Sequence, residues 1–288
     1  MSMMQPSTTA ISTERVQTGN AWLWASWTLA VREVVRFLRQ RSRVTGAIGQ
    51  PILFWILFGA GLSGSFQFGG GDTTAGMSFQ EYFLPGVAAL IVLFTSIFSS
   101  ISIIQDRNEG FLQGVLVAPV PRSSIVMGKI LGGTALALLQ AFLFVIVAPL
   151  LQFVGLAPPM TLQLSAFSLI GAFLFLMLIS LGLTSLGYLF AWKIDSVQGY
   201  HAVMSLVLLP MWLMSGAFFP GTDSVWLTWL IRLNPLTYGV AGLRRVLTVD
   251  QSVLVGVPPL WLCVVVTTLF AAVLFAIDVW ITRRDQAV

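Results

Sequence analysis

The sequence is 288 residues long, 57% hydrophobic and only 9% charged, with 21 phenylalanines and 10 tryptophans. Soluble domains carry about 25% charged residues, so this composition excludes an ordinary soluble fold and indicates a chain whose main solvent is a lipid bilayer. The formal net charge of +4 does not indicate nucleic-acid binding, because the basic residues flank apolar runs and do not cluster on one soluble face.

The amino-terminal segment divides into a polar tail and an amphipathic helix. Residues 1–20 contain Glu14 and Arg15 but no apolar core of about 7 to 15 residues, so they predict a disordered cytoplasmic tail and not a signal peptide. Within residues 21–46, apolar and basic side chains fall on opposite helical faces, which predicts a helix lying in the membrane interface. The apolar face consists of Trp24, Trp27, Val31, Val34, Val35 and Leu38, and the basic face of Arg32, Arg36 and Arg39 with Glu33 beside them.

We expect the arginines of this helix to face lipid headgroups or a cytoplasmic partner. Leu29 and Phe37 lie on the polar side and favour a protein partner. The alternative is a simple membrane anchor with no mechanical role.

Residues 47–288 form the membrane domain, because they contain six apolar runs. A helix that crosses the bilayer needs about 20 mostly apolar residues at about 1.5 Å each. The predicted spans are 47–62, 84–104, 125–154, 164–192, 202–219 and 260–282. The third and fourth are long enough to tilt or to extend beyond the bilayer.

The basic residues predict the orientation of these spans. Twelve of the fifteen Lys and Arg fall on one side of a six-span arrangement, and only Arg232, Arg244 and Arg245 fall on the other. Basic residues are concentrated in cytoplasmic segments, so both termini are predicted to be cytoplasmic.

The segment 105–122 after the second span predicts a short rigid helix. It opens with charged residues, continues with Phe111, Leu112, Val115 and Leu116, and ends at Pro119-Val120-Pro121, which cannot continue a helix. Such an element between two spans is suited to transmit force from a docked protein. The alternative is a plain polar connection, but that would rarely place four apolar side chains toward water.

The segment 221–258 between the last two spans predicts a helix-turn-helix that enters the outer leaflet without crossing it. Val225, Trp226, Trp229, Leu230 and Leu233 recur at helical spacing, Asn234-Pro235 breaks the helix, and the helical pattern resumes from Leu236 to Leu247. A re-entrant element buries the two tryptophans, whereas an exposed outer loop would leave them in water.

Catalytic and metal-binding patterns are missing from the sequence. His201 is the single histidine, near Lys193 and Asp195 at a membrane boundary, and Cys263 is the single cysteine, which excludes an intrachain disulfide. No HExxH, paired-cysteine, GxSxG or GxxxxGK[ST] motif occurs. If ATP drives this protein, another chain must bind it.

Ion coupling has one candidate carboxylate in the apolar runs. Asp278 lies close to the cytoplasmic end of the sixth span, whereas coupling ions usually bind near the bilayer centre. We therefore expect Asp278 to pair with Arg283 or Arg284 or to face headgroups.

Two regions together resemble the type-2 ABC exporter permeases, in particular the drug-resistance and nodulation-export branch. The first is Glu109-Gly110-Phe111-Leu112 followed by Ala118-Pro119 and Gly128-Lys129. The second is Asn234-Pro235-Leu236-Thr237-Tyr238 leading to Arg244. The resemblance covers nearly the whole chain after residue 20, and Gln113 departs from it, since many relatives carry a charged or bulkier residue there.

The resemblance implies an all-α permease of a bacterial cytoplasmic (inner) membrane, which dimerises above two cytoplasmic ATPase subunits. ATP and Mg would then bind to those partners, and no cofactor to this chain. The amphipathic helix would be the connecting helix, and Trp226–Leu247 the re-entrant outer element, with its gate at Trp226, Trp229, Asn234, Pro235 and Tyr238. The coupling helix would span Asp106 to Ala118, with the ATPase-coupling residues Arg107, Glu109, Gly110, Phe111, Leu112 and Pro119.

The favoured function is export of an amphipathic or lipid-like substrate by the ATP hydrolysed on the partner. The second and fifth spans would line the path, through Phe94, Phe98, Met204, Leu208, Met211 and Trp212, although each of these also suits packing or lipid contact. Two alternatives remain. An ion-coupled secondary transporter would depend on Asp278, and a membrane-embedded lipid-modifying enzyme would use Lys193, Asp195 and His201.

Overall fold

The computed structural model describes residues 20–62, 77–118, 120–218, 224–251, 254 and 256–284. Over these residues the chain is helical, and its only extended pairing is an isolated antiparallel bridge between Leu162 and Thr248. The predicted tail, except for Asn20, lies outside the described residues, as does Pro119.

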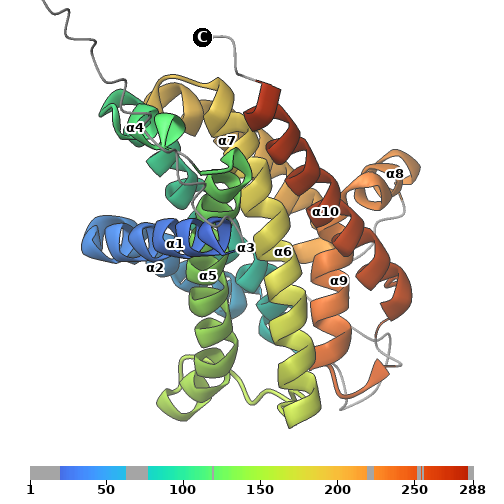
Figure 1. The fold of residues 1–288 in the computed structure, drawn as a ribbon. Coiled ribbons are helices and arrows are strands. Elements are labelled where there is room, and N and C mark those ends of the chain that lie inside the picture. Colours follow the sequence, from blue (N-terminus) through green and yellow to red (C-terminus); the bar gives the residue numbers. More distant parts are fainter. Residues whose placement is uncertain are drawn as a thin grey trace, which may run out of the picture.

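The first two helices are joined almost directly. Helix α1 runs from Ala21 to Arg39 and α2 from Arg41 to Leu62, with Gln40 between them outside helical geometry. In Figure 1, α1 passes across α5 and does not run alongside it. The amphipathic pattern of α1 therefore forms a separate helix that crosses the bundle, while α2 is the first candidate span.

Helix α3, Phe79–Asn108, is the central element of the bundle. It starts at Ser78, whose hydroxyl accepts from the Glu81 amide at 3.2 Å, an N-cap that satisfies one free amide of the first turn. It extends beyond the predicted span 84–104 at both ends. Of an apolar stretch of 18 residues within it, 89% is buried inside the subunit. The second span is therefore mostly covered by the subunit's own helices, which leaves it little surface for a second copy.

The middle of the chain forms a short helical connection and two long spans. Helix α4 covers Phe111–Val117, and α5 runs from Arg122 to Val147 and continues as a 3₁₀ segment, η1, from Ala148 to Val154. Helix α6 covers Ala166–Lys193. Its first turn is capped by Ser165, which accepts from the Ser168 amide at 3.2 Å.

The fifth span ends in an irregular turn. Helix α7 covers Val197–Trp212 and passes into a π-helical turn, η2, at Leu213–Ala217. Gly216 has φ +68°, a left-handed conformation that glycine adopts without steric cost. Helices α8 (Val225–Leu233) and α9 (Pro235–Leu247) follow, and α10 covers Leu260–Arg284. The helix break at Asn234-Pro235 is confirmed.

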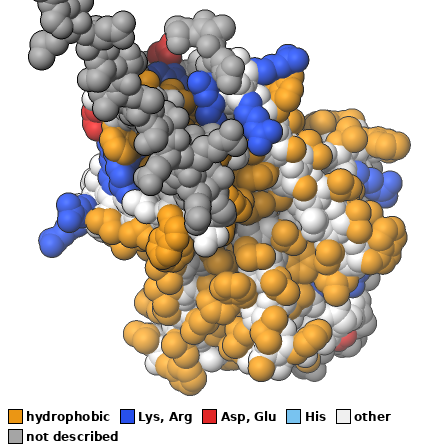
Figure 2. All heavy atoms as spheres, viewed as in Figure 1, with side chains coloured by type: hydrophobic (Ala, Val, Ile, Leu, Met, Phe, Trp, Pro, Cys, Tyr) orange, Lys and Arg blue, Asp and Glu red, His pale blue; other side chains and the backbone are white. Residues whose placement is uncertain are grey.

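The described residues contain six helices long and apolar enough to cross a membrane: Val44–Leu62, Phe79–Asn108, Arg122–Val154, Ala166–Lys193, Val197–Ala217 and Leu260–Arg284. Each corresponds to one of the six predicted runs, so the all-α, six-span prediction is confirmed. Figure 2 shows apolar side chains over most of one face, with Lys and Arg mainly toward the end where α4 and the end of α10 lie. The chain is a multi-pass membrane protein.

Tryptophans attach neighbouring helices to the backbone of α3. The Trp55 indole of α2 donates to the Gln80 carbonyl at 3.0 Å, and the Trp212 indole of α7 donates to the Gly86 carbonyl at 2.7 Å. A buried indole N–H needs an acceptor, and backbone carbonyls of α3 supply it. These bonds fix α2 and α7 against the central helix.

Candidate functional site

A cluster of ionised side chains joins α1, α3 and α5 near the carboxyl end of α3. At its centre is Asp106, which has no exposed surface. The Arg32 guanidinium donates to both carboxylate oxygens of Asp106, at 2.8 and 3.0 Å, and this bidentate geometry gives the strongest kind of ion pair. Arg36 and Lys129 also donate to Asp106. Because Asp106 accepts from Arg32, the pKa of that guanidinium is raised.

Lys129 extends the cluster into the interior of α5. Its ammonium, almost fully buried, donates to Glu33 at 2.6 Å and to the Ser102 hydroxyl at 3.2 Å, besides Asp106. Arg36 also reaches Glu109 at 3.1 Å. The cluster thus contains three cations (Arg32, Arg36 and Lys129) and three carboxylates (Glu33, Asp106 and Glu109). Balanced pairing offsets the large cost of burying each charge.

Two glycines on α5 allow α1 to approach closely enough for these pairs. A Cβ added at Gly128 would lie 2.6 Å from the Leu29 Cβ and 2.8 Å from the Ser26 carbonyl oxygen. One added at Gly132 would lie 2.7 Å from the Glu33 Cβ and 3.0 Å from the Ala30 carbonyl oxygen. Both contacts are too short for any larger residue, and small residues spaced by four are typical of close helix crossings in membranes. Helix α1 is therefore packed on the bundle as an integral element.

Helix α4 is attached to the same cluster. Gly110, with φ +75°, reverses the chain after α3, a left-handed turn that favours glycine. The Arg32 guanidinium lies over the Phe111 ring, 3.7 Å from its centre, a cation–π contact. Leu112 is buried, whereas Phe111 is 37% exposed and Val117 is 86% exposed. One face of α4 is thus held by the subunit, and apolar side chains remain exposed on the other.

Arg107 connects the end of α3 to the end of α6. It donates to the Trp192 carbonyl at 2.6 Å and to Asp195 at 2.9 Å. The carbonyls of the last turn of a helix have no partner within the helix, and a guanidinium satisfies them. The carboxyl end of α3 therefore contacts α1, α5 and α6 through ionic or hydrogen-bonded side chains.

The structure differs from the expectation for two arginines of this region. Arg32 and Arg36 bind buried Asp106 and are directed inward, not toward headgroups or a partner. Glu109 pairs with Arg36 and lies at the C-cap of α3. Arg39 and the two tryptophans Trp24 and Trp27 are exposed. Pro119 lies outside the described residues.

The six residues predicted to line a path occupy two environments. Phe94 and Phe98 are partly buried, and their rings are stacked with centroids 6.3 Å apart. Met211 is also partly buried. Met204, Leu208 and Trp212 are enclosed by the subunit's own side chains. These last three are core residues in this conformation, and the path assignment stays a prediction.

The segment predicted to form an outer gate forms two helices, with α8 set apart from the bundle in Figure 1. Trp226 and Trp229 are exposed, and no residue of α8 is buried, so the re-entrant assignment stays a prediction. Asn234 accepts from the Leu236 amide at 3.0 Å and donates to the Met211 carbonyl at 2.5 Å. Tyr238 donates to the Arg232 carbonyl at 2.8 Å. Pro235 is the first residue of α9, where its missing amide costs nothing.

Arg244 fixes the irregular end of α7. Its guanidinium is buried, lies 3.7 Å over the Tyr82 ring and donates to the Gly216 and Tyr82 carbonyls at 3.0 and 3.2 Å. Burial lowers the pKa of Arg244. The Tyr82 hydroxyl also donates to the Gly216 carbonyl, at 2.9 Å. The start of α3 and the end of α7 therefore hold a cation on backbone oxygens and an aromatic face.

Two residues of the enzyme alternative have other contacts in the structure. Asp195 binds Arg107, while His201 packs against the rings of Phe98 and Tyr200, 5.9 and 6.4 Å away. Among the described residues no group of three or more His, Cys, Asp or Glu lies close enough to hold a metal ion.

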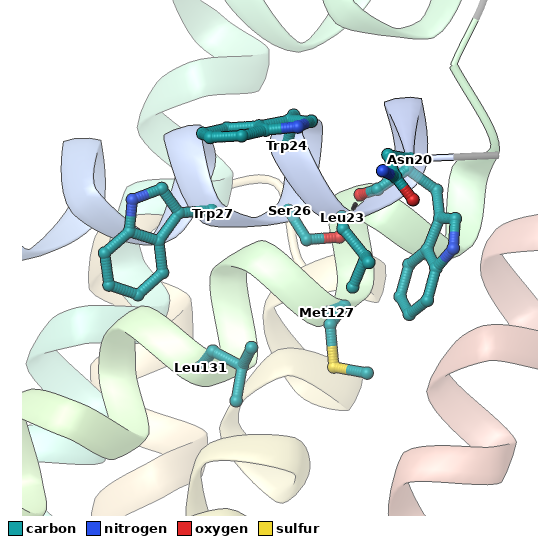
Figure 3. A pocket seen from close by; sticks show the side chains of 8 residues that line it. Asn20, Leu23, Trp24, Ser26, Trp27, Met127 and Leu131 are labelled. Atoms are coloured by element: carbon teal, nitrogen blue, oxygen red, sulfur yellow. Dashed lines mark hydrogen bonds between the residues drawn. The ribbon is translucent and has the colours of Figure 1, made fainter. Parts of the chain in front are cut away.

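An open groove of about 610 Å³ lies between the amino-terminal part of α1 and α5. Figure 3 shows Leu23 of α1 directed toward Met127 of α5, with Trp24 and Trp27 above and Leu131 below. Asn20 and Ser26 contribute polar atoms, and the Ser26 hydroxyl already donates to the Trp22 carbonyl at 2.7 Å. The groove is thus mostly apolar and suits a hydrocarbon or aromatic group.

Comparison with known proteins identifies relatives over most of the chain. Residues 25–248 match the family described as ABC-2 type transporter. The chain is 31% identical to "Putative transport permease ycf38" of Cyanophora paradoxa over 221 residues, which are 75% of this chain and 71% of the relative. It is 28% identical to the protein of the same name from Porphyra purpurea, over 76% of this chain and 72% of the relative. It is 19% identical to "Daunorubicin resistance ABC transporter permease protein DrrB1" of Streptomyces coeruleorubidus, over 75% of this chain and 72% of the relative.

Proposed function

The chain belongs to the ABC-2 type transporter family and is the transmembrane subunit of an ABC transporter, which works with an ABC ATPase subunit; we propose that it exports an amphipathic or lipid-like substrate. ATP and Mg bind to the separate ATPase in this proposal. The chain supplies the membrane path and the mechanical connection.

The observation that carries the proposal is the attachment of α4 to three membrane-associated helices through one charge cluster. An ATPase that moves α4 acts on Phe111 and Glu109, which contact Arg32 and Arg36 of α1. The same arginines bind Asp106 of α3. Packed cores have discrete arrangements and do not deform continuously. A displacement of α4 would therefore move α1, α3 and α5 together.

The surface of α4 supports it as the docking element. Phe111 and Val117 are exposed apolar residues on a seven-residue helix, and exposed apolar groups beside charged ones are typical of protein interfaces. The coupling residues of this proposal are Arg107, Glu109, Gly110, Phe111, Leu112 and Pro119. Two ATPases would dock beneath a homodimer of this chain.

Two observations support an amphipathic substrate. The groove between α1 and α5 has apolar walls and lies on the helix whose exposed tryptophans suit the membrane interface. The relative DrrB1 is named as a daunorubicin resistance ABC transporter permease protein, and we extend an amphipathic substrate of this kind to the chain. The membrane of this proposal is a bacterial inner membrane, and the excess of basic residues on one side of the six spans supports a cytoplasmic location for both termini.

Transport in inverted membrane vesicles tests this function. Vesicles containing the chain and its ABC ATPase are expected to accumulate daunorubicin, used as the amphipathic probe, only when ATP and Mg are supplied. Gly110→Val, which strains the left-handed turn before α4, is expected to reduce uptake at normal membrane levels. Gly114→Ala is the matched control, because no atom lies within 4 Å of its added Cβ. Equal uptake without ATP, or in the absence of the chain, would contradict export by this subunit.

A further inference from the structure

Asp278 of α10 is a buried carboxyl group in an apolar helix. Its exposed fraction is 0%, and among the described residues neither carboxylate oxygen has a partner at hydrogen-bond distance. The expected pairing with Arg283 or Arg284 is therefore wrong in the structure, where Arg284 lies over the Trp280 ring at 4.2 Å. An ionised carboxylate without a partner in an apolar interior costs several kcal/mol or more. The arrangement accommodates a neutral, protonated carboxyl far better.

The immediate surroundings of Asp278 are hydroxyl groups. Ser185 and Tyr188 of α6 face it, and Thr282 lies one turn along α10. The Tyr188 and Thr282 hydroxyls bind each other at 3.0 Å, whereas the buried Ser185 hydroxyl has no completed hydrogen bond. Hydroxyls accept a hydrogen bond from a protonated carboxyl as readily as they donate one to a carboxylate. The site can thus hold either protonation state once it relaxes.

Charged groups on every neighbouring helix bind elsewhere. In the described residues no ion pair joins Asp278 to a basic side chain. Arg107 of α3 binds the Trp192 carbonyl, Arg122 of α5 binds the Thr282 carbonyl at 3.4 Å, and Arg284 of α10 lies over the Trp280 ring. Among the described residues, no ion pair therefore compensates a charge on Asp278.

The seam around Asp278 is polar but closed. Farther along the same two helices, the buried hydroxyls of Ser180 (α6) and Thr267 (α10) also have no partner among the described residues. Tyr188 and Lys129 line a crevice, with serines of α3, that has no room for a water molecule. Close packing maintains this closure, since a Cβ at Gly182 of α6 would lie 2.6 Å from the Phe270 ring of α10. Unpartnered hydroxyls are rare in folded proteins and need an explanation; here they would bind water if α6 and α10 separated.

We propose that Asp278 is a proton-binding site, which holds a proton while α6 and α10 are packed as in this structure and releases it when the seam opens to water. On release the carboxyl O–H bond breaks, its electron pair stays on the carboxylate and the proton passes to a water molecule. On closing, a hydronium ion returns the proton. The transport cycle would then include a proton-linked step within the membrane subunit, in addition to ATP hydrolysis on its partner.

Infrared spectroscopy of the purified full-length chain tests the proton directly, without reference to transport. At neutral pH the parent is expected to show the C=O stretching band of a protonated carboxylic acid, which Asp278→Asn lacks. Asp106→Asn is the control and should keep the band, because Asp106 is ionised among three cations. Identical spectra for the parent and Asp278→Asn would overturn the proposal. Ser185→Ala is a second variant, expected to shift the band, and an unshifted band would contradict the assignment.

The release step is tested by the pH profile of ATP-driven daunorubicin uptake in vesicles that contain the whole complex. Parent uptake is expected to fall at alkaline pH, because the closing step must recover a proton from an increasingly dilute supply. Asp278→Asn is expected to lose this alkaline fall. Equal profiles would overturn release even if the band is present. Loss of uptake in every sample at every pH would count against the exporter function alone, because the infrared result stands apart from it.

Discussion

Asp106 and Asp278 are two aspartates with no exposed surface in membrane-spanning helices, yet their surroundings are opposite. Asp106 accepts from Arg32, Arg36 and Lys129, whereas Asp278 has no partner. The first is an ionised centre that holds helices together, and the second is a neutral group in a seam of hydroxyls. Burial alone therefore does not define the role of a carboxyl group; the cations that the fold brings beside it do.

Replacing each aspartate by asparagine should give the largest difference in the free energy of unfolding. Asp106→Asn leaves three cations facing too little negative charge, and breaking a buried ion pair costs about 3–5 kcal/mol. Asp278→Asn preserves shape and neutrality, so its cost is expected to be below about 1.5 kcal/mol. Chemical unfolding of the purified proteins in one detergent measures both. Similar losses at the two positions would mean that Asp278 is ionised or that the cluster is dispensable.

The close crossing of α1 on α5 should show the next largest effect. Gly128→Ala and Gly132→Ala each force a Cβ into backbone or Cβ atoms of α1, and such overpacking costs about 1–3 kcal/mol. Gly49→Ala on α2 is the matched control, with no atom within 4 Å of the added Cβ, and it is expected to be neutral or slightly stabilising. The unfolding temperatures of the three variants and the parent measure these effects. If all three unfold like the parent, α1 is a loosely attached anchor.

The exposed end of the charge cluster should show the smallest effect on stability. Glu109 is 60% exposed in its pair with Arg36, and exposed ion pairs contribute about 0–1 kcal/mol. Glu109→Ala is therefore expected to unfold almost like the parent but to reduce ATP-driven uptake, since Glu109 lies beside α4. Arg39→Ala, a substitution of an exposed arginine on the same helix as Arg36, is the control for loss of surface charge. Full uptake by Glu109→Ala would remove this residue from the coupling site.

Local sequence signals predicted the elements but not the pairing between them. Six apolar runs fix the spans because the bilayer requires their length, and Asn234-Pro235 ends α8 because of local backbone chemistry. Glu33, Asp106 and Lys129 come together from three separate helices, and nothing in one sequence reports such distances. The signal for them was weak: a Lys inside an apolar run and a Glu on an arginine face. That the Asp278 carboxyl has no hydrogen-bond partner among the described residues likewise depends on packing alone.

The most direct test of the coupling assignment uses two exposed valines in separate parts of the subunit. Val117 at the end of α4 is 86% exposed, and Val249 after α9 is 59% exposed. A photoreactive side chain is introduced at each position in turn, in membranes that contain the ABC ATPase, and crosslinked products are identified by mass spectrometry. We predict an ATPase adduct from position 117 and none from position 249. An adduct from position 249 alone, or from neither position while the ATPase is bound, would contradict the role of α4 in coupling.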